Sequence, residues 1–356
     1  MRLGIIGLPQ AGKTTVFNAL TRGGQPTTTS GGKFEVRTAV VAVPDPRLDS
    51  LVALFRPRDI THARVTYADI AGLDGSAGKA GLSGPLLNQL SQVDGFLEVV
   101  RCFEDERVPH SQGQLDPCRD ISLMDQELLL QDLISVERKL ERLGEERHRS
   151  GGRDKVLLER EIALFEKLHA ALLLEKPLRD LELSAEEEKS LAGYGFLTRK
   201  PILILLNLSE GQTPPDVTCP YQRCGVALLQ GKLEMEIVQL PPEEAGLFMA
   251  EFGIQEPGLN MVIRLSYDLL GRQSFFTVGE DEVRAWTIPN GATAYQAAGA
   301  IHTDLQKGFI RAEVVAYEDL LSLGGLAEAR ARGKLRLEGK EYILKDGEIM
   351  HVRFNV

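Results

Sequence analysis

The sequence lacks the features that mark membrane proteins, secreted proteins and proteins that coat nucleic acid. No apolar run approaches the roughly 20 residues that a membrane-spanning helix needs. The first residues, MRLGIIGLP, are too short and too rich in glycine for a signal peptide. The chain also carries no excess of positive charge, since its net charge is -10 at pH 7. We therefore expect a cytoplasmic protein that does not bind membranes and that meets its partners through local patches.

Cysteine is scarce as well. Cys102, Cys118, Cys219 and Cys224 form no CxxC pair, and no histidines stand at the spacing of a zinc site. Neither a structural zinc nor a disulfide framework is therefore expected. Ordinary reduced thiols are the simplest interpretation for a cytoplasmic chain.

What the sequence does contain is enough apolar residues for two or three domains, with 43% hydrophobic and 26% charged residues over 356 positions. Short apolar runs predict the strands of a parallel sheet wrapped by helices, which is an α/β fold. These runs are residues 3–6, 38–43, 64–67, 96–100 and 202–206.

Between the last two of these strands the pattern becomes that of a helical hairpin. Apolar residues repeat at alternating spacings of four and three in a first run, Leu129, Leu133, Val136, Leu140 and Leu143. A second run, Leu158, Ile162, Phe165 and Leu172, keeps the same pattern, with His169 at the position between the last two. An antiparallel coiled-coil insertion is the economical interpretation, and two ordinary surface helices are the alternative. After Pro257, segments that alternate apolar and polar residues predict a small mixed sheet with a helix near residues 294–302.

The residues GLPQAGKT, from Gly7 to Thr14, match the phosphate-binding pattern GxxxxGK[ST] between a strand and a helix. Backbone N–H groups of such a loop and the positive end of the helix bind a polyphosphate. Lys13 should reach the β- and γ-phosphates, and the Thr14 hydroxyl should bind Mg²⁺. The expected nucleotide-contacting residues are Leu8, Pro9, Gln10, Ala11, Gly12, Lys13, Thr14 and Thr15.

Asp69, in the segment TYADIAG, ends a predicted strand where a second magnesium-shell carboxylate belongs, so Mg²⁺ is the expected cofactor. Gly72 could approach a γ-phosphate with its backbone N–H. Leu73 follows it, where a Ras-like switch places a glutamine that orients water. Because an apolar side chain cannot polarise water, another group must position the water or turnover must be slow.

The segment LILLNLSEGQ ends a predicted strand on Asn207. A guanine-binding protein would show Asn-Lys-x-Asp here, whereas this chain has Leu208 and Glu210 in place of the lysine and aspartate. Asn207 can pair with N6 and N7 of adenine, as asparagine does when it reads adenine in DNA. We therefore expect ATP and ADP to bind more tightly than GTP and GDP. A loose pocket that accepts both purines is the alternative.

With these motifs placed, the chain resembles the YchF/Obg-like ATPase family over nearly its whole length. The resemblance rests on GLPQAGKTT, PDPRLD, DIAGL, VVRCFED, LSAEEEKSL, QEPGLN and, most specifically, the stretches VRAWTIPNGATAYQAAGAIHTDLQKGFIRAEVVAYEDL and GKLRLEGKEYILKDGEIMHVRFNV. It implies a P-loop domain at residues 1–108 and 190–275, a coiled-coil insertion at 109–189 and a β-grasp TGS domain at 276–356. It also implies ATP hydrolysis, association with ribosomes or ribosomal RNA, and a role in translation or stress. His110 matches a histidine that the family is thought to use in hydrolysis.

The chain also departs from the family pattern. The phosphate loop has Gln10, Ala11 and Thr14 where NVGKS is usual, and Lys33 falls near the position of a threonine that closes over Mg²⁺. A GTP-binding switch, or a nucleotide-dependent scaffold with little hydrolysis, therefore remain alternatives. We expect a monomer. Two basic clusters could contact RNA or simply be solvated, namely Arg147, Arg149, Arg153 and Lys155, then Arg330, Arg332, Lys334 and Arg336.

Overall fold

The computed structural model describes residues 1–21, 28–30, 36–70, 82–110, 113–148, 154–219 and 221–355. By its contacts the chain separates into two compact units, residues 1–39 with 66–262, and residues 40–65 with 263–356. The sequence pattern did not indicate that residues 40–65 lie with the C-terminal segment, and the three-domain division stays a prediction. No helix within the described ranges is both long enough and apolar enough to cross a membrane.

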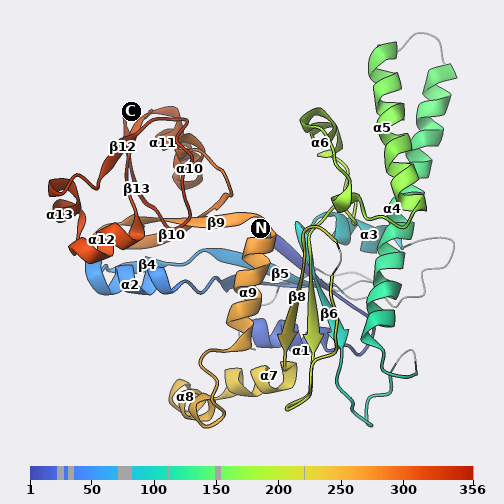
Figure 1. The fold of residues 1–356 in the computed structure, drawn as a ribbon, viewed down its shortest axis with the longest axis horizontal. Coiled ribbons are helices and arrows are strands. Elements are labelled where there is room, and N and C mark those ends of the chain that lie inside the picture. The colour runs from blue at the N-terminus through green and yellow to red at the C-terminus, as the bar shows by residue number, and fades with distance from the viewer. Residues whose placement is uncertain are drawn as a thin grey trace. The chain divides into compact units, whose positions relative to one another are not determined.

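The first unit is built on a seven-stranded sheet (Figure 1). In spatial order its strands are β2 (Thr28–Ser30), β3 (Val36–Ala42), β5 (Arg64–Ile70), β1 (Arg2–Ile6), β6 (Gly95–Arg101), β7 (Ile202–Asn207) and β8 (Cys224–Leu229). The strands from β5 to β8 in this order are parallel. Every residue of β6 and β7 is buried, as expected of strands covered on both faces. The five strands predicted from apolar runs are confirmed. Those at residues 3–6, 64–67, 96–100 and 202–206 are parallel, so their carboxyl ends meet at one edge of the sheet.

Between and after these strands the chain forms further helices. They are α1 (Lys13–Leu20), α3 (Gly84–Ser91), α6 (Ala185–Leu191), α7 (Gly231–Gln239), α8 (Pro242–Glu251) and α9 (Gly258–Leu269), with a 3-10 turn at Leu178–Asp180. Helix α9 runs across the boundary between the two units. Helix α1 buries Val16, Phe17, Ala19 and Leu20. Helices α1 and α7 contact each other. The phosphate loop, which directly precedes α1, therefore lies near the segment that follows β8.

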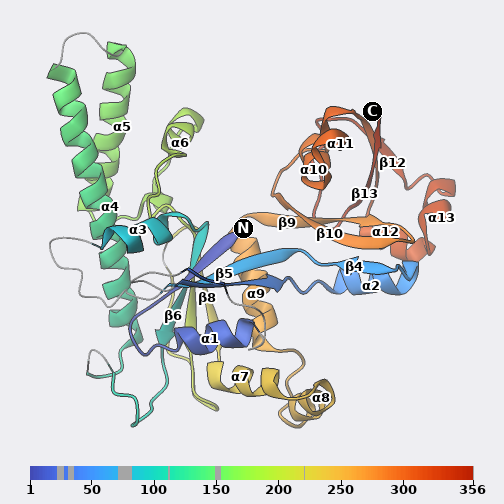
Figure 2. The same ribbon diagram turned by 180° about the vertical axis from the view of Figure 1, so that it is seen from behind.

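The longest helices, α4 (Pro117–His148) and α5 (Lys155–Leu173), lie side by side in both views (Figures 1 and 2). The two predicted helical runs and their apolar contact are confirmed, because their buried residues form one cluster. The members of the predicted seam in this cluster are Leu129, Val136, Leu143, Leu158, Ile162, Phe165 and Leu172, with Leu133 and Leu140 packed against it. The tip, residues 149–153, lies outside the described residues.

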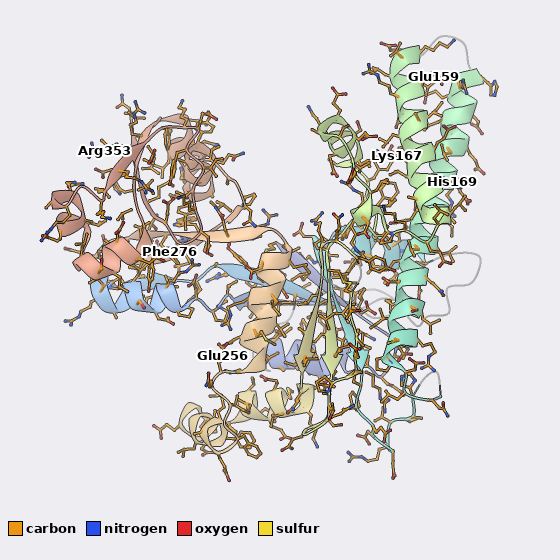
Figure 3. All side chains as sticks on the ribbon, viewed as in Figure 1. Glu159, Lys167, His169, Glu256, Phe276 and Arg353 are labelled. Carbon is orange, nitrogen blue, oxygen red and sulfur yellow. A yellow bond between two sulfur atoms is a disulfide. The ribbon has the colours of Figure 1, made fainter. Side chains whose placement is uncertain are left out.

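Polar contacts accompany this apolar seam, and Figure 3 labels three of the residues that make them, Glu159, Lys167 and His169. Arg147 Nε lies 2.9 Å from Glu159 Oε1, and His169 Nε2 lies 3.5 Å from Glu137 Oε1. Lys167 Nζ, on α5, donates a hydrogen bond of 2.8 Å to the carbonyl oxygen of Glu182. The contacts made by Arg147 and His169 join α4 to α5, and that of Lys167 joins α5 to the segment before α6.

A buried carboxylate fastens α4 to the loop before β7. Asp132 Oδ1 accepts a hydrogen bond of 2.8 Å from the N–H of Leu197. Its Oδ2 accepts two bonds of 2.7 Å from the N–H and the hydroxyl of Thr198. Burial raises the pKa of Asp132 to about 6, although these hydrogen bonds oppose the shift. The helical hairpin is therefore anchored to the sheet by a group that has no access to water.

The second unit contains a six-stranded sheet. Its order is β12 (Arg336–Glu338), β11 (Phe309–Val315), β13 (Ile349–Phe354), β9 (Arg272–Val278), β10 (Glu282–Pro289) and β4 (Asp59–Thr61), and its helices are α2 (Pro46–Phe55), α10 (Ala294–Ile301), α11 (Thr303–Lys307), α12 (Tyr317–Leu323) and α13 (Leu326–Ala331). Alanines of α10 pack in one core with Phe275 and Val314 of the sheet. The predicted mixed sheet and its helix near 294–302 are confirmed.

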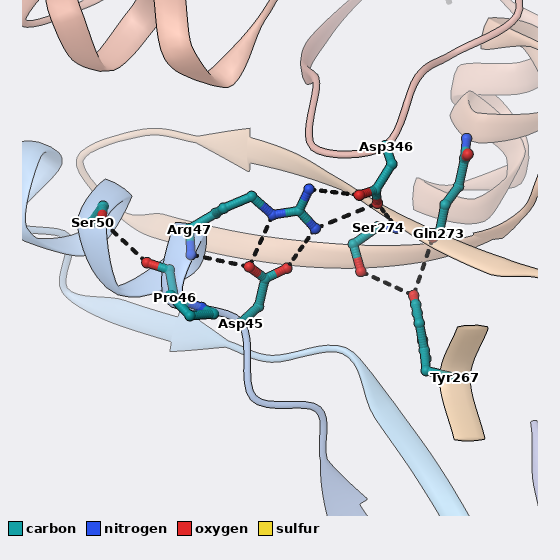
Figure 4. Close-up of polar contacts among 8 residues, drawn as sticks. All are labelled: Asp45, Pro46, Arg47, Ser50, Tyr267, Gln273, Ser274 and Asp346. Atoms are coloured by element: carbon teal, nitrogen blue, oxygen red, sulfur yellow. Dashed lines mark hydrogen bonds and ion pairs between the residues drawn. The ribbon is translucent and has the colours of Figure 1, made fainter. Parts of the chain in front are cut away.

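The motif PDPRLD attaches α2 to this second sheet (Figure 4). Asp45 caps the helix by accepting a bond of 3.0 Å from the N–H of Arg47. The Arg47 guanidinium lies 2.9 Å from Asp45 and 2.6 Å from Asp346, while Asp346 also accepts from the N–H of Ser274. Burial acts to lower the pKa of Arg47, but the two carboxylates outweigh it and raise that pKa. These contacts explain why residues 40–65 belong with the C-terminal segment.

The prediction of four reduced thiols is wrong for one pair. Cys219 and Cys224 form a disulfide with a Cα–Cα distance of 6.1 Å. A turn just before β8, with Arg223 in the left-handed region at a φ of 51°, brings the two residues within disulfide reach. Cys102 and Cys118 are free, as predicted, and burial raises the pKa of Cys102 to about 12.

We predict that Asp132→Asn lowers the free energy of unfolding by about 1–3 kcal/mol, the usual cost of an unpaired buried polar group. An asparagine presents only one acceptor oxygen, so its amide N–H groups would face a donor. Urea denaturation measures the effect. Glu137→Gln, an exposed carboxylate on the same helix, is the control and should change stability by no more than about 0.5 kcal/mol. Equal stability of the two variants would contradict the anchoring role.

Candidate nucleotide-binding site

The phosphate loop has a backbone that requires glycine at two positions. Gly7 has a φ of 142°, and a Cβ there would lie 2.3 Å from the carbonyl oxygen of Val99. Gly12 has a φ of 99°, and a Cβ there would lie 2.3 Å from Nδ2 of Asn207. Helix α1 begins at Lys13 directly after this turn. The loop therefore presents a helix N-terminus, which favours bound anions.

Lys13 is held inside this loop. Its Nζ donates hydrogen bonds of 2.7 Å to the carbonyl oxygen of Gly7 and 2.8 Å to that of Leu8. Burial lowers the pKa of Lys13, and the nearby Asp69 carboxylate opposes this shift. The arrangement places one point charge where a phosphate would meet the loop.

Thr14 and Asp69 lie together, as the sequence predicted. The Thr14 hydroxyl donates to Asp69 Oδ2 over 3.3 Å, although the two residues are 55 positions apart. Burial raises the pKa of Asp69, while the Thr14 bond and the charge of Lys13 oppose it. A hydroxyl and a carboxylate are hard oxygen donors that suit Mg²⁺. In the described part of the chain no three His, Cys, Asp or Glu residues gather to hold a metal, so phosphate and water would have to supply the remaining ligands.

A cavity of about 740 Å³ opens beside the phosphate loop, a volume within the range of small-molecule sites. It is lined by Gln10, Gly12, Lys13, Thr14, Thr15, Phe103, Glu104, Asp105, Arg107, Val108, Asn207, Leu208, Ser209, Glu210, Gln230, Lys232, Leu233 and Glu236. The structure thus brings the loop and the Asn207 segment to one cavity. Of the predicted loop residues, Leu8, Pro9 and Ala11 do not line it, and Leu8 and Ala11 are buried.

Asn207 bridges two sides of this cavity. Its Nδ2 donates a bond of 3.0 Å to the carbonyl oxygen of Ala11, and its Oδ1 accepts one of 3.0 Å from the N–H of Gly231. The residue is only 4% exposed. One amide N–H and one lone pair remain for a base, so the predicted purine contact is compatible with this geometry and stays a prediction. Sequence reasoning missed the bridging role.

Leu208 and Glu210, which the sequence also predicts to contact the base, differ in burial. Leu208 lines the cavity but is 6% exposed and packs in a cluster with Cys102 and Leu206. Glu210 is exposed at the cavity rim. A lysine at position 208 would therefore disturb an apolar core, whereas changes at position 210 would not.

Sequence reasoning also missed the segment after β6 and the start of α7, which contribute about half of the lining residues. Arg101 holds the first of these segments, with Nε donating to the carbonyl oxygen of Phe103 and a terminal nitrogen donating to that of Val108. The signal was available, because ligands bind at the carboxyl ends of parallel strands and both segments follow such ends.

His110 does not line the cavity. Its Nε2 lies 2.9 Å from Oδ2 of Asp120, and the two side chains are 7% and 4% exposed. The predicted switch positions Lys33, Gly72 and Leu73 lie outside the described residues.

Comparison with known proteins gives full-length matches. The family model YchF-GTPase_C, described as a protein of unknown function (DUF933), matches residues 272–355. The chain is 41% identical to the "Ribosome-binding ATPase YchF" of Pasteurella multocida over 100% of this chain and 99% of that protein. It is 40% identical to the protein of the same name from Bacillus subtilis over 99% of both. Among solved structures, the Schizosaccharomyces pombe YchF GTPase matches with a TM-score of 0.84 and 33% identity, covering 99% of this chain and 97% of that one. The predicted resemblance is confirmed.

We predict that Asn207→Ala lowers the stability of the nucleotide-free protein by about 1–3 kcal/mol, because it leaves a buried carbonyl and a buried N–H without partners. Thermal and urea unfolding without nucleotide measure this effect. Asn88→Ala, at an exposed position of α3, is the control. If Asn207→Ala weakened nucleotide binding and left the nucleotide-free stability unchanged, Asn207 would be a base contact without the bridging role.

Proposed function

The chain belongs to the YchF family, and on that premise we propose that it is a cytoplasmic, ATP-binding and ATP-hydrolysing P-loop protein that acts on ribosomes. The observation that carries the proposal is one cavity lined by Lys13, Thr14 and the Asn207 segment, with Asp69, outside the lining, hydrogen-bonded to Thr14. Phosphate, metal and base each have a matching group at this site. The parts of the proposal that concern the ribosome and ATP hydrolysis rest on the names of the relatives.

Mg²⁺, bound by Thr14 and Asp69 together with phosphate oxygens, would neutralise charge that develops on the phosphates during hydrolysis. Lys13 and the N–H groups of the loop bind and orient the β- and γ-phosphates. Because Leu73 cannot orient water, we assign the positioning of the attacking water to His110. In the structure His110 is bound to Asp120, so it must change position before it can act.

Preference for ATP over GTP is supported by the base-reading segment. Glu210 is one methylene longer than the aspartate of a guanine site, so its carboxylate would not reach guanine N1–H at the same point. Leu208 supplies an apolar wall, and Asn207 keeps one donor and one acceptor for the adenine edge. ATP and ADP should therefore bind more tightly than GTP and GDP.

For the other parts of the chain we propose a coiled-coil insertion at residues 109–189 and a β-grasp TGS domain at 276–356, in a protein that is a monomer. The packed helices α4 and α5 and the six-stranded sheet support this assignment. All four cations of the C-terminal basic cluster pair with acids, namely Arg330 with Glu313, Arg332 with Glu328, Lys334 with Asp319 and Arg336 with Glu348. This pairing favours the solvated-face interpretation for that cluster, and Arg147 of the hairpin cluster is paired in the same way with Glu159.

We expect Lys13→Ala to lower ATP affinity by at least about tenfold, or about 1.4 kcal/mol, because it removes the point charge of the phosphate site. Titration with a fluorescent ATP analogue and measurement of phosphate release would test it. Lys189→Ala, an exposed cation on α6 outside the cavity, is the control. Unchanged ATP affinity in Lys13→Ala would exclude the assigned phosphate site.

Competition binding tests the base preference. Wild-type protein should bind ADP more tightly than GDP, and Glu210→Asp should shift the preference toward guanine by about 1 kcal/mol or more, the lower part of the range for a bidentate base contact. Glu236→Asp shortens another carboxylate of the cavity and should leave the preference unchanged. A wild type that prefers GDP over ADP would make the protein a GTP-binding switch instead.

A further inference from the structure

We propose that Asp120 is a positioning residue that holds His110 away from the nucleotide phosphates until ATP binds. The inference rests on the proposed function, in which His110 positions the attacking water. In addition, Asp120 determines when His110 reaches the nucleotide. Since Asp120 lies on α4, the release of His110 also depends on the position of that helix.

The contact between the two residues is short and protected from water. His110 Nε2 lies 2.9 Å from Asp120 Oδ2, and neither side chain is more than 7% exposed. The N–H of Gly113 donates a bond of 3.1 Å to the carbonyl oxygen of His110, and Gly113 has a φ of 83°. A backbone hydrogen bond thus holds the carbonyl group of His110 while Asp120 holds its ring. In this position His110 does not line the cavity in which the phosphates are proposed to bind.

Asp120 is itself fixed. Its Oδ1 accepts hydrogen bonds of 3.1 Å and 2.8 Å from the Arg119 guanidinium. Its N–H donates to the carbonyl oxygen of Asp116 in the first turn of α4. Both carboxylate oxygens therefore have partners, and the one that holds His110 keeps a constant direction.

His110 nevertheless lies close to the cavity along the chain. Val108, two residues before it, is the last cavity-lining residue of the segment that Arg101 holds. Two residues of extended chain span about 7 Å. A change confined to the end of this segment can thus bring the imidazole to the cavity without any movement of the sheet.

Because Asp120 lies on α4, a displacement of this helix would also affect how His110 is held. Asp120 lies in the first turn of α4, the helix that continues for 32 residues to the hairpin tip. Whatever displaces the base of α4 also displaces the carboxylate that holds His110. A partner bound to the hairpin could therefore release His110, which would couple partner binding to hydrolysis.

The kinetic experiment compares Asp120→Asn with Asp125→Asn. Asp125 is a second carboxylate near the base of α4 and lies 3.8 Å from Arg179. Asp120→Asn should raise kcat for ATP hydrolysis about threefold or more while the KM for ATP changes by less than about twofold, because a neutral amide holds the imidazole less strongly. Asp125→Asn should leave both constants unchanged. The double variant His110→Gln with Asp120→Asn should have the low kcat of His110→Gln alone, which a general loosening of the fold would not produce.

A second measurement uses wild-type protein and so does not depend on how the variants fold. The ring signals of His110 are assigned in NMR spectra by their loss in His110→Gln. They should move when a non-hydrolysable ATP analogue and Mg²⁺ are added, and in Asp120→Asn without nucleotide they should move in the same direction.

The outcomes separate the two hypotheses. A wild type that hydrolyses ATP, together with an Asp120→Asn variant whose kcat is unchanged or lower, would overturn the role of Asp120 and leave the proposed function intact. His110 signals that stay unchanged at saturating analogue would overturn it as well. A wild type that binds no nucleotide would overturn the proposed function, and the role of Asp120 with it.

Discussion

The side-chain amide of Asn207 is the contact on which the nucleotide cavity depends. It joins the phosphate loop, through the carbonyl oxygen of Ala11, to the start of α7, through the N–H of Gly231. Because the amide is buried, water cannot replace it as the partner of either backbone group. Glycine at positions 12 and 231 lets the amide approach this closely, since a Cβ at either position would lie within 2.8 Å of it. One side chain therefore links the phosphate loop to the opposite wall of the cavity.

The parallel sheet places the functional groups of the site around Asn207. Each strand end contributes one component, with the phosphate loop after β1, Asp69 in β5, the segment 103–108 after β6 and Asn207 at the end of β7. The strands bring these groups together because parallel neighbours end at the same edge. The segment after β6 then continues to His110 and into α4, so the cavity and the helical hairpin are adjacent along the chain.

The local clusters of charged residues say more about the partners of this protein than its net charge does. The net charge of -10 would disfavour a nucleic-acid partner, yet basic residues occur in clusters. The structure pairs the C-terminal cations with acids of the same unit, and it pairs Arg147 of the hairpin cluster with Glu159. In the same way Arg47 pairs with Asp45 and Asp346, contacts that serve the packing of its unit.

The sequence by itself determined the phosphate loop, the Thr14 and Asp69 positions, the buried strands and the two helical runs. Each depends on a local pattern, either a glycine spacing that a tight turn requires or an apolar period that a buried face requires. Only the tertiary structure decided that Asn207 bridges the cavity, that His110 lies against Asp120, and that residues 40–65 pack with the C-terminal segment. The bridge of Asn207 and the packing of residues 40–65 join residues far apart in the chain, so no periodic signal marks them. The pair His110–Asp120 is nearer in sequence, but it depends on how a loop folds back on the first turn of a helix, and loop geometry follows from packing rather than from composition.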